Sequence, residues 1–272
     1  MRVVVLSRWG LLLVGVYLAI LALGVGLLFP WPSVRRAAGD LAVAVSSARR
    51  RIPIYSVGIT EKKVAISFDA AWGAEYTPRI LEILRRHKVK TTFFLVGFWI
   101  ERYPEVVKQI AAEGHEIGNH TNTHPHLNSL SREGIKTELS EVHRRIKELT
   151  GQEARLFRPP FGEYSNQVIE VAEELGYTTI QWSVDSLDWQ DVTSDAIVRK
   201  VTGEIHPGAI VLFHNNARYT PDALEPIIQH LQGEGYTIVP ISQLILKGPY
   251  YVDHQGVQRA GNAPAAPGGA AY

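Results

Sequence analysis

The chain has 272 residues, of which 46% are hydrophobic, so it can bury the core of one sizeable domain and leave other segments outside it. The 28 Lys and Arg residues nearly balance the 27 Asp and Glu residues, and the central region has no dense basic tract, so no nucleic-acid partner is expected. Cysteine is absent, which excludes disulfides and cysteine nucleophiles and leaves His, Asp or Glu to hold any metal.

The first predicted element is an uncharged run from Trp9 to Phe29. As a helix it would be roughly 30 Å long, which is enough to span a bilayer. We therefore expect residues 1–30 to form a membrane anchor. A cleaved signal peptide is the alternative, but the run exceeds a usual signal core and no clear small-x-small site follows it. Arginines flank both sides of the run, so charge does not decide its orientation.

Three further regions follow the predicted anchor. Residues 31–55 carry arginines and small residues and are predicted to form a membrane-proximal stem. The folded domain is expected over 56–247. Residues 248–272 end in AGNAPAAPGGAAY, a composition with little to bury, so a disordered tail is expected there.

Within the predicted domain, β-like runs alternate with helical ones in chain order. The pattern predicts a strand at 64–69, a helix from 77, a strand at 91–96, a helix over 104–113, a strand at 115–120, a helix over 131–150, a strand at 154–160, a helix over 165–176, a strand at 178–185, a helix near 196, a strand at 208–214, a helix from 221 and a strand at 236–241. Such alternation indicates an α/β fold with a parallel sheet. A distorted (β/α) barrel of seven to eight units fits the pattern as well as an open doubly wound sheet.

Ionisable side chains stand where five of the predicted strands end. In a (β/α) barrel these ends form one rim, where reacting groups collect. One strand-terminal Asp alone would more often be a helix cap or a turn residue. Five such residues on one rim predict an active site: Asp69, His120, Arg158, Asp185 and His214.

The segment HTNTHPH supplies two histidines, His120 and His124, at a four-residue spacing. Neutral imidazole is a common zinc ligand, so the pair can share an ion, although this spacing alone is weak evidence. His126 follows Pro125, which redirects the chain, and is interpreted as a substrate or structural residue.

Three other segments suggest chemical roles. In FRPPFG, two prolines fix the loop after Arg158, which suits a guanidinium that holds a carboxylate. In WSVDSLDW, Asp185 can pair with a rim His or Arg, and Trp189 can stack on a sugar ring. In LFHNNA, His214 ends a buried strand and is a natural general acid.

Taken in order, the motifs FD, HTNTH, RPPFG, VDSLDW and LFH resemble those of the polysaccharide deacetylases, the NodB homology domain of carbohydrate esterase family 4, across about residues 60–245. VDSLDW and the segment from FHNNARYTPDALEPII to EGYTIVPISQLI look more like the sporulation-associated PdaB-like branch. The resemblance implies an irregular (β/α) barrel, a zinc or cobalt ion, and N-acetylated substrates such as chitooligosaccharides or peptidoglycan sugars, or xylan.

The resemblance also implies a role for each catalytic residue. Asp69 matches the base that activates water, and Arg158 matches the arginine that positions this base. His214 matches the acid that protonates the departing amine, and Asp185 matches the carboxylate that tunes the acid. The residues expected to bind substrate are Trp189, Leu212, Phe161 and Asp188.

The metal site is where the sequence departs from the family pattern. His120 and His124 match two of the three metal ligands. The third is an Asp directly after the base, but this chain has Ala70 there, in SFDAAWG. Because a methyl group cannot ligate, the zinc or cobalt ion is expected to bind weakly.

These observations lead to a main hypothesis and two alternatives. The main hypothesis is a metal-dependent N-deacetylase of cell-wall glycan, with peptidoglycan and sporulation as its context. It would be a single-pass protein of the cell membrane, or of a spore or forespore envelope, with its catalytic domain outside the cytoplasm, where acetylated wall sugars lie. The first alternative is a glycan-binding pseudo-deacetylase that has lost its metal. The second is an O-acetyl esterase.

Overall fold

The structure is a computed structural model that describes residues 50–263. The predicted anchor, residues 1–30, and nearly all of the predicted stem lie outside this range. Within it, no helix is both long and apolar enough to cross a membrane.

A single parallel sheet forms the centre of the described domain. Its strand order is β6-β5-β4-β3-β2-β8-β7, with β9 also paired to β2. The bounds of these strands are β2 Lys63–Ala70, β3 Thr92–Leu95, β4 Glu116–Asn119, β5 Leu156–Phe157, β6 Thr178–Thr179, β7 Val184–Asp185, β8 Ile210–His214 and β9 Thr237–Ile238. Because every pair is parallel, the carboxyl ends of these strands share one edge.

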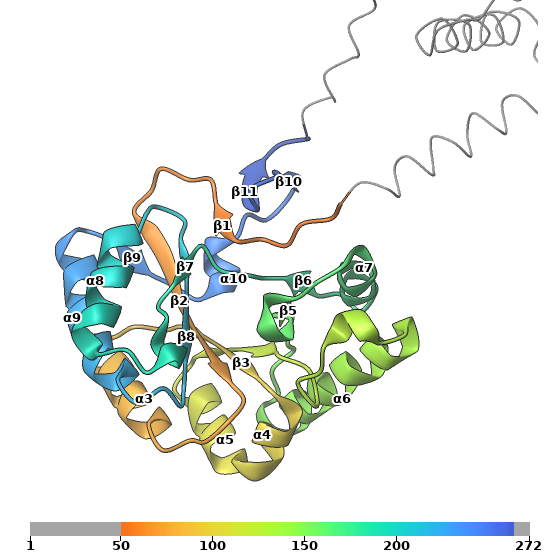
Figure 1. The fold of residues 1–272 in the computed structure, drawn as a ribbon, viewed down its shortest axis with the longest axis horizontal. Coiled ribbons are helices and arrows are strands. Elements are labelled where there is room, and N and C mark those ends of the chain that lie inside the picture. The colour runs from red at the N-terminus through yellow and green to blue at the C-terminus, as the bar shows by residue number, and fades with distance from the viewer. Residues whose placement is uncertain (1–49, 264–272) are drawn as a thin grey trace, which may run out of the picture. The chain divides into compact units, whose positions relative to one another are not determined.

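Helices cover the outer side of the sheet in an arc (Figure 1). Their bounds are α3 Thr77–Arg86, α4 Gly97–Arg102, α5 Pro104–Ala112, α6 Arg132–Thr150, α7 Asn166–Glu174, α8 Ser194–Glu204 and α9 Thr220–Gly233. The short helix α10, Ile241–Leu244, is not part of this arc and packs against the other face of the sheet, with Ala65. The predicted helix over 131–150 is confirmed: the Ser131 hydroxyl accepts the Gly134 N–H as its N-cap, and Gly151 ends it in the left-handed conformation at φ 72°. The short helix α4 was not predicted from the sequence.

The sheet is curled but not closed. The run predicted as one strand over 178–185 is two short strands, β6 and β7, which do not pair with each other. The segment before β2 spans this opening, because Ile54 bridges to Ile180 and Ser56 bridges to Ala209. The fold is therefore a curled parallel half-barrel with helices outside, in agreement with the predicted distorted (β/α) barrel in architecture but without its full closure.

Side-chain alternation along β2 separates the two faces of the sheet. Val64, Ile66, Phe68 and Ala70 belong to the core between the sheet and the helices, where Phe68 stacks on Phe93 at a centroid distance of 5.0 Å. The intervening Ala65 belongs to a second cluster inside the curl. Asp69 shares the face of Ala65, and Ala70 faces the opposite way.

A second, three-stranded sheet corrects both predicted domain boundaries. It consists of β1 Ser56–Val57, β11 Val257–Ala260 and β10 Tyr250–Val252, in that order. The predicted disordered tail therefore begins too early, because tyrosine and valine side chains upstream of the Ala/Pro/Gly run supply β-forming residues. Gln258 is fully buried and accepts the Leu246 N–H at 2.8 Å. The predicted stem ends too late, because Ile54 is buried in the core.

The corrected C-terminal boundary can be tested by truncation. A chain ending after Lys247 should unfold at a temperature at least about 4 °C lower than the full chain, since β1 loses its partner strand and Gln258 its place in the core. Circular dichroism melting measures this shift. A chain ending after Ala263 is the control and should melt like the full chain; equal melting of both truncations would restore the boundary at 247.

Candidate active site

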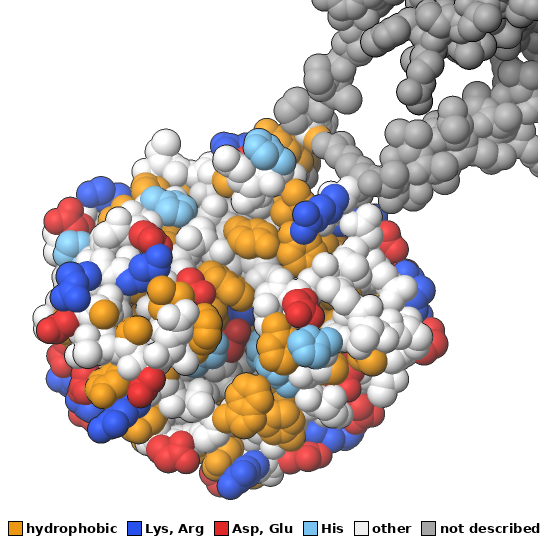
Figure 2. Space-filling view, viewed as in Figure 1, with side chains coloured by type: hydrophobic (Ala, Val, Ile, Leu, Met, Phe, Trp, Pro, Cys, Tyr) orange, Lys and Arg blue, Asp and Glu red, His pale blue; other side chains and the backbone are white. Residues whose placement is uncertain are grey.

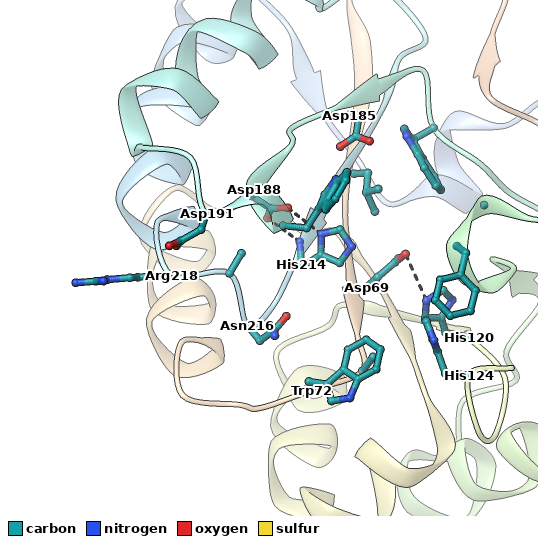
Figure 3. Close-up of a pocket in the computed structure, with 17 residues that line it drawn as sticks. Asp69, Trp72, His120, His124, Asp185, Asp188, Asp191, His214, Asn216 and Arg218 are labelled. Atoms are coloured by element: carbon teal, nitrogen blue, oxygen red, sulfur yellow. Dashed lines mark hydrogen bonds and ion pairs between the residues drawn. The ribbon is translucent and has the colours of Figure 1, made fainter.

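The carboxyl ends of the parallel strands bring the five predicted rim residues together, and all of them except the buried Arg158 line one pocket. Asp69 and His214 are directly paired in the register of β2 and β8, and Asp185 is paired with Leu212. His120 directly follows β4, and Arg158 directly follows β5. Figure 3 shows Asp69 between His214 on one side and His120 on the other. The sequence prediction that these residues meet at one rim is thus confirmed, while their chemical roles stay predictions.

Arg158 holds Asp69 through a buried ion pair. Its Nη1 lies 2.7 Å from Asp69 Oδ1, and its side chain has no exposed surface. The guanidinium also donates to Ser67 Oγ at 2.9 Å, and it lies 4.2 Å from the centroid of the Phe94 ring. Burial would raise the pKa of Asp69, but the nearby positive charges, Arg158 foremost, outweigh burial and lower it below its ordinary value. Asp69 is therefore ionised at neutral pH.

The backbone carbonyl of Arg158 holds His120 next to Oδ2, the second carboxylate oxygen of Asp69. Its Nδ1 lies 2.7 Å from the carbonyl oxygen of Arg158, which can only accept, so Nδ1 carries the proton. Burial lowers the pKa of His120, so the ring is neutral and its Nε2 presents a lone pair. That Nε2 lies 3.5 Å from Asp69 Oδ2, longer than an ordinary hydrogen bond.

His124 sits among aromatic rings. Its ring centroid lies 5.0 Å from that of Trp72, 5.0 Å from that of His120 and 4.6 Å from that of Phe161, each in an edge-on arrangement. Burial lowers the pKa of His124 to about 4. Both predicted metal ligands are therefore neutral imidazoles, the form that a metal requires.

The residues present do not complete a metal site of the catalytic kind. Such sites use three protein ligands, and no group of three His, Cys, Asp or Glu side chains suited to an ion occurs among residues 50–263. Ala70, at the position of the expected third ligand, is fully buried on the helix side of β2. One oxygen of Asp69 is already bound to Arg158. His120 and His124 remain the predicted ligands of a weakly bound zinc or cobalt ion.

Asp188 is the carboxylate that holds His214, which corrects the assignment of this role to Asp185. Asp188 Oδ1 lies 2.8 Å from His214 Nδ1, and its Oδ2 accepts the His214 backbone N–H at 2.8 Å. Asp185 instead accepts the Leu187 backbone N–H at 2.9 Å and lines the pocket. Leu187 adopts φ 58°, a left-handed turn that carries Asp188 behind the imidazole, so the spacing of the two carboxylates did not indicate which would pair.

Asp188 determines the charge of His214. Burial would lower the pKa of His214, but the hydrogen bond and negative charge of Asp188 outweigh it and raise the pKa above its ordinary value of 6.5. With Nδ1 bound to Asp188, Nε2 is left for the pocket. His214 can therefore supply a proton near neutral pH.

The pocket between these groups has a volume of about 580 Å³ and is bordered by aromatic side chains. Hydrophobic side chains surround a hollow on this face of the molecule (Figure 2). Trp72, Phe161 and Trp189 are each more than half exposed at 55%, 55% and 57%, so a ligand can reach them. One face of Phe161 is stacked on the His126 ring at a centroid distance of 4.4 Å. Leu212 lines the pocket as predicted, and Asp188 lines it behind His214.

Sequence reasoning missed several pocket residues. Trp72 lies in the quoted segment SFDAAWG, and an exposed tryptophan three residues after a catalytic carboxylate was the available signal. The others follow a strand or turn without a distinctive pattern: Ala71, Gly162, Trp182, Asp191, Asn216, Ala217 and Arg218. Arg218 points away from the pocket centre in Figure 3.

Comparison with known proteins gives a consistent result. The family model described as polysaccharide deacetylase matches residues 57–180. The chain is 38% identical over 196 residues to a peptidoglycan-N-acetylglucosamine deacetylase of Bacillus cereus, covering 70% of this chain and 92% of that protein. It is also 35% identical over 193 residues to the uncharacterized protein YlxY of Bacillus subtilis, covering 71% of this chain but only 60% of YlxY.

Among solved structures, one similar protein is a pseudoenzyme of carbohydrate esterase family 4 from Bacillus anthracis. The TM-score is 0.69 and the sequences are 40% identical, with 71% of this chain and 68% of that chain covered. The same fold and family thus include a protein described as lacking the activity.

Replacement of each carboxylate will test which one sets the charge of His214. In Asp188→Asn, burial is no longer opposed by the hydrogen-bonded charge, so the pKa of His214 should fall below 6.5. In the matched variant Asp185→Asn it should stay raised. NMR titration of the His214 ring measures both values. A larger fall in the His214 pKa in Asp185→Asn than in Asp188→Asn would reverse the assignment.

The same pair should affect stability in a pH-dependent way. Because the folded-state pKa of His214 is raised, its contribution is fully present below the unfolded pKa and is lost as pH rises through the folded pKa.

Proposed function

Because the chain belongs to the polysaccharide deacetylase family, a family of hydrolases, we propose that it hydrolyses N-acetyl groups of cell-wall glycan, with peptidoglycan as the substrate class. The observation that carries this proposal is the pair Asp69 and His214, an ionised carboxylate and a protonatable imidazole on neighbouring strands at one pocket. This pair has the two proton-transfer groups that amide hydrolysis needs.

Asp69 serves as the general base. It takes a proton from a water molecule whose oxygen attacks the acetyl carbonyl carbon. Arg158 fixes the carboxylate by its Oδ1, so Oδ2 is the oxygen available to the water. The lowered pKa of Asp69 keeps it ionised but also makes it a weaker base, so the carbonyl must be activated as well.

His214 serves as the general acid. Its Nε2–H gives a proton to the amide nitrogen as the C–N bond breaks, which releases acetate and leaves the sugar with a free amine. Asp188 stabilises the imidazolium before transfer and fixes the ring orientation. The raised pKa of His214 keeps a larger protonated fraction near pH 7 than an ordinary histidine would have.

The exposed aromatic side chains supply binding surface for sugar rings. Trp72 and Trp189 are on the rim of the pocket, on loops that follow β2 and β7, and Phe161 follows β5. Their faces can stack on the apolar faces of pyranose rings.

Members of this family are generally metal-dependent, and a zinc or cobalt ion would polarise the acetyl carbonyl. With His120 and His124 as its predicted ligands and Ala70 in place of a third, we propose that any such ion binds weakly in this chain.

We also propose that the run from Trp9 to Phe29 anchors the domain to the cytoplasmic membrane. The domain would lie outside this membrane, because the acetylated wall sugars are outside it. The link to sporulation and the PdaB-like branch are part of the same proposal and rest on the motifs VDSLDW and EGYTIVPISQLI.

A second candidate function is glycan binding without hydrolysis. Two observations favour it: Ala70 is buried away from the pocket, and a solved structure with a TM-score of 0.69 is that of a pseudoenzyme. On this view the aromatic rim binds sugar, while the incomplete metal site leaves the carbonyl without activation. The third possibility, O-acetyl ester hydrolysis, needs weaker activation and is separated from the first by its substrate.

Acetate release tests the proposed function. The full-length chain, supplied with zinc or cobalt, should release acetate from N-acetylated peptidoglycan, and Asp69→Asn should lower the rate by about 100- to 10,000-fold because the general base is lost. Asp195→Asn, an exposed carboxylate on α8, is the matched control and should not change it. Release from an O-acetylated glycan only would favour the esterase. No release from either substrate, while a known deacetylase is active beside it, would favour binding alone.

Ala70→Asp tests the metal site. Position 70 is the last residue of β2 and stands between Asp69 and Ala71, which both line the pocket, so a longer side chain there can turn toward it. The new carboxylate should tighten zinc binding by at least about 10-fold, measured by isothermal titration. Without zinc the variant should melt at a lower temperature than the parent chain, because a carboxylate replaces a fully buried methyl group. A lower melting temperature with unchanged zinc affinity would mean that position 70 belongs only to the core.

A further inference from the structure

The loop that carries the two pocket histidines, residues 120–124, has a strained backbone. Thr121 adopts φ 70° and His124 adopts φ 56°, both in the left-handed region although neither is glycine. Such conformations are unfavourable for residues that carry a Cβ, and they persist only where the surroundings hold them. The orientation of His120 and His124 therefore depends on what binds this loop.

Glu138, on α6, binds the middle of the loop with both carboxylate oxygens. Its Oε2 accepts the backbone N–H of Asn122 and that of Thr123, each at 2.8 Å. Its Oε1 accepts the Thr123 hydroxyl at 2.8 Å. Charge-assisted hydrogen bonds of this kind are about twice as strong as neutral ones. One side chain thus fixes two consecutive peptide groups between the two histidines.

Other contacts hold the loop at Thr121 and at the Asn122 side chain, so Glu138 supplies the hold on the peptide groups in between. Asn119 Oδ1 accepts the Thr121 N–H at 2.9 Å, and Gly97 donates its N–H to the Thr121 carbonyl at 2.9 Å. A Cβ on Gly97 would lie 2.1 Å from Asn122 Oδ1, so the loop approaches α4 as closely as a glycine allows. Arg145 Nη1 donates to the same Asn122 oxygen at 3.0 Å.

Glu138 is not among the residues that line the pocket. Its effect on the pocket must therefore pass through the backbone of residues 122 and 123 to the histidines on either side. The carboxylate is also half-buried, so water can partly replace its hydrogen bonds if it is removed, but water cannot hold two peptide groups in one strained geometry.

We propose that Glu138 is a positioning residue that holds the His120–His124 loop in the conformation that places both imidazoles at the pocket. Its consequence for hydrolysis rests on the proposed function, whereas its hold on the loop does not. Loss of the carboxylate should let residues 121–124 relax toward unstrained backbone and move His124 out of its contacts with Trp72 and Phe161.

Three variants of the full-length chain test this proposal. Glu138→Ala removes all three hydrogen bonds. Glu138→Gln keeps them, because the amide oxygen can accept both backbone N–H groups and the amide nitrogen can donate to the Thr123 hydroxyl. Glu141→Ala removes a carboxylate from the same helix whose partner, Arg144, is also on that helix, and serves as the matched control.

Amide hydrogen exchange and steady-state kinetics are the two readouts. In Glu138→Ala, exchange of residues 121–124 should be at least about 10-fold faster than in the parent chain. Its kcat for acetate release should fall by about 10- to 100-fold with little change in KM. Glu138→Gln should restore both properties, and Glu141→Ala should alter neither.

The outcomes separate this proposal from the proposed function. Faster exchange confined to the loop supports the positioning role even if the parent chain releases no acetate. The missing acetate would then count against the proposed hydrolysis and not against the role of Glu138. Unchanged exchange in Glu138→Ala would overturn the proposal. So would faster exchange across the whole of α6, or failure of Glu138→Gln to restore the loop, since either result indicates a general structural role.

Discussion

The buried ion pair between Asp69 and Arg158 is the interaction on which the pocket depends. Two charges removed from water cost several kcal/mol each unless their partners are complete, and here the guanidinium also meets Ser67, the Gln181 carbonyl and the Phe94 ring. Those partners come from β2, from β3 and from the segment after β6, so the pair forms only when these parts of the sheet have come together. The ionisation of Asp69, the proposed base, therefore depends on the correctly folded sheet.

The pleat of β2 explains why neighbouring residues have different fates. Asp69 faces the inside of the curl and reaches the pocket, whereas Ala70 faces the helices and joins the apolar core. An alanine at position 70 therefore fits the apolar core, and it leaves the carboxylate of Asp69 in its place at the pocket.

The two proton-transfer groups are tuned in opposite directions by their partners. Both are desolvated, but a cation beside Asp69 favours the charged carboxylate and a carboxylate beside His214 favours the charged imidazolium. For the imidazoles of His120 and His124, burial outweighs the attraction of Asp69, so both rings stay neutral. One pocket therefore holds a negative carboxylate, a protonatable imidazole and two neutral imidazoles, and Glu138 binds the loop that carries the last two.

The sequence by itself determined the alternation of strands and helices, the five strand ends that meet at one rim, the two histidines and the family. These features are local or periodic, so a single stretch of chain contains them. Only the tertiary structure decided that Asp188 rather than Asp185 pairs with His214, that Trp72 joins the rim, that residues 250–252 and 257–260 are strands, and that Glu138 holds the histidine loop. Each of these depends on a turn or on a partner far away in the chain, because a left-handed residue such as Leu187 redirects a side chain and a strand edge finds its partner only after the domain has folded.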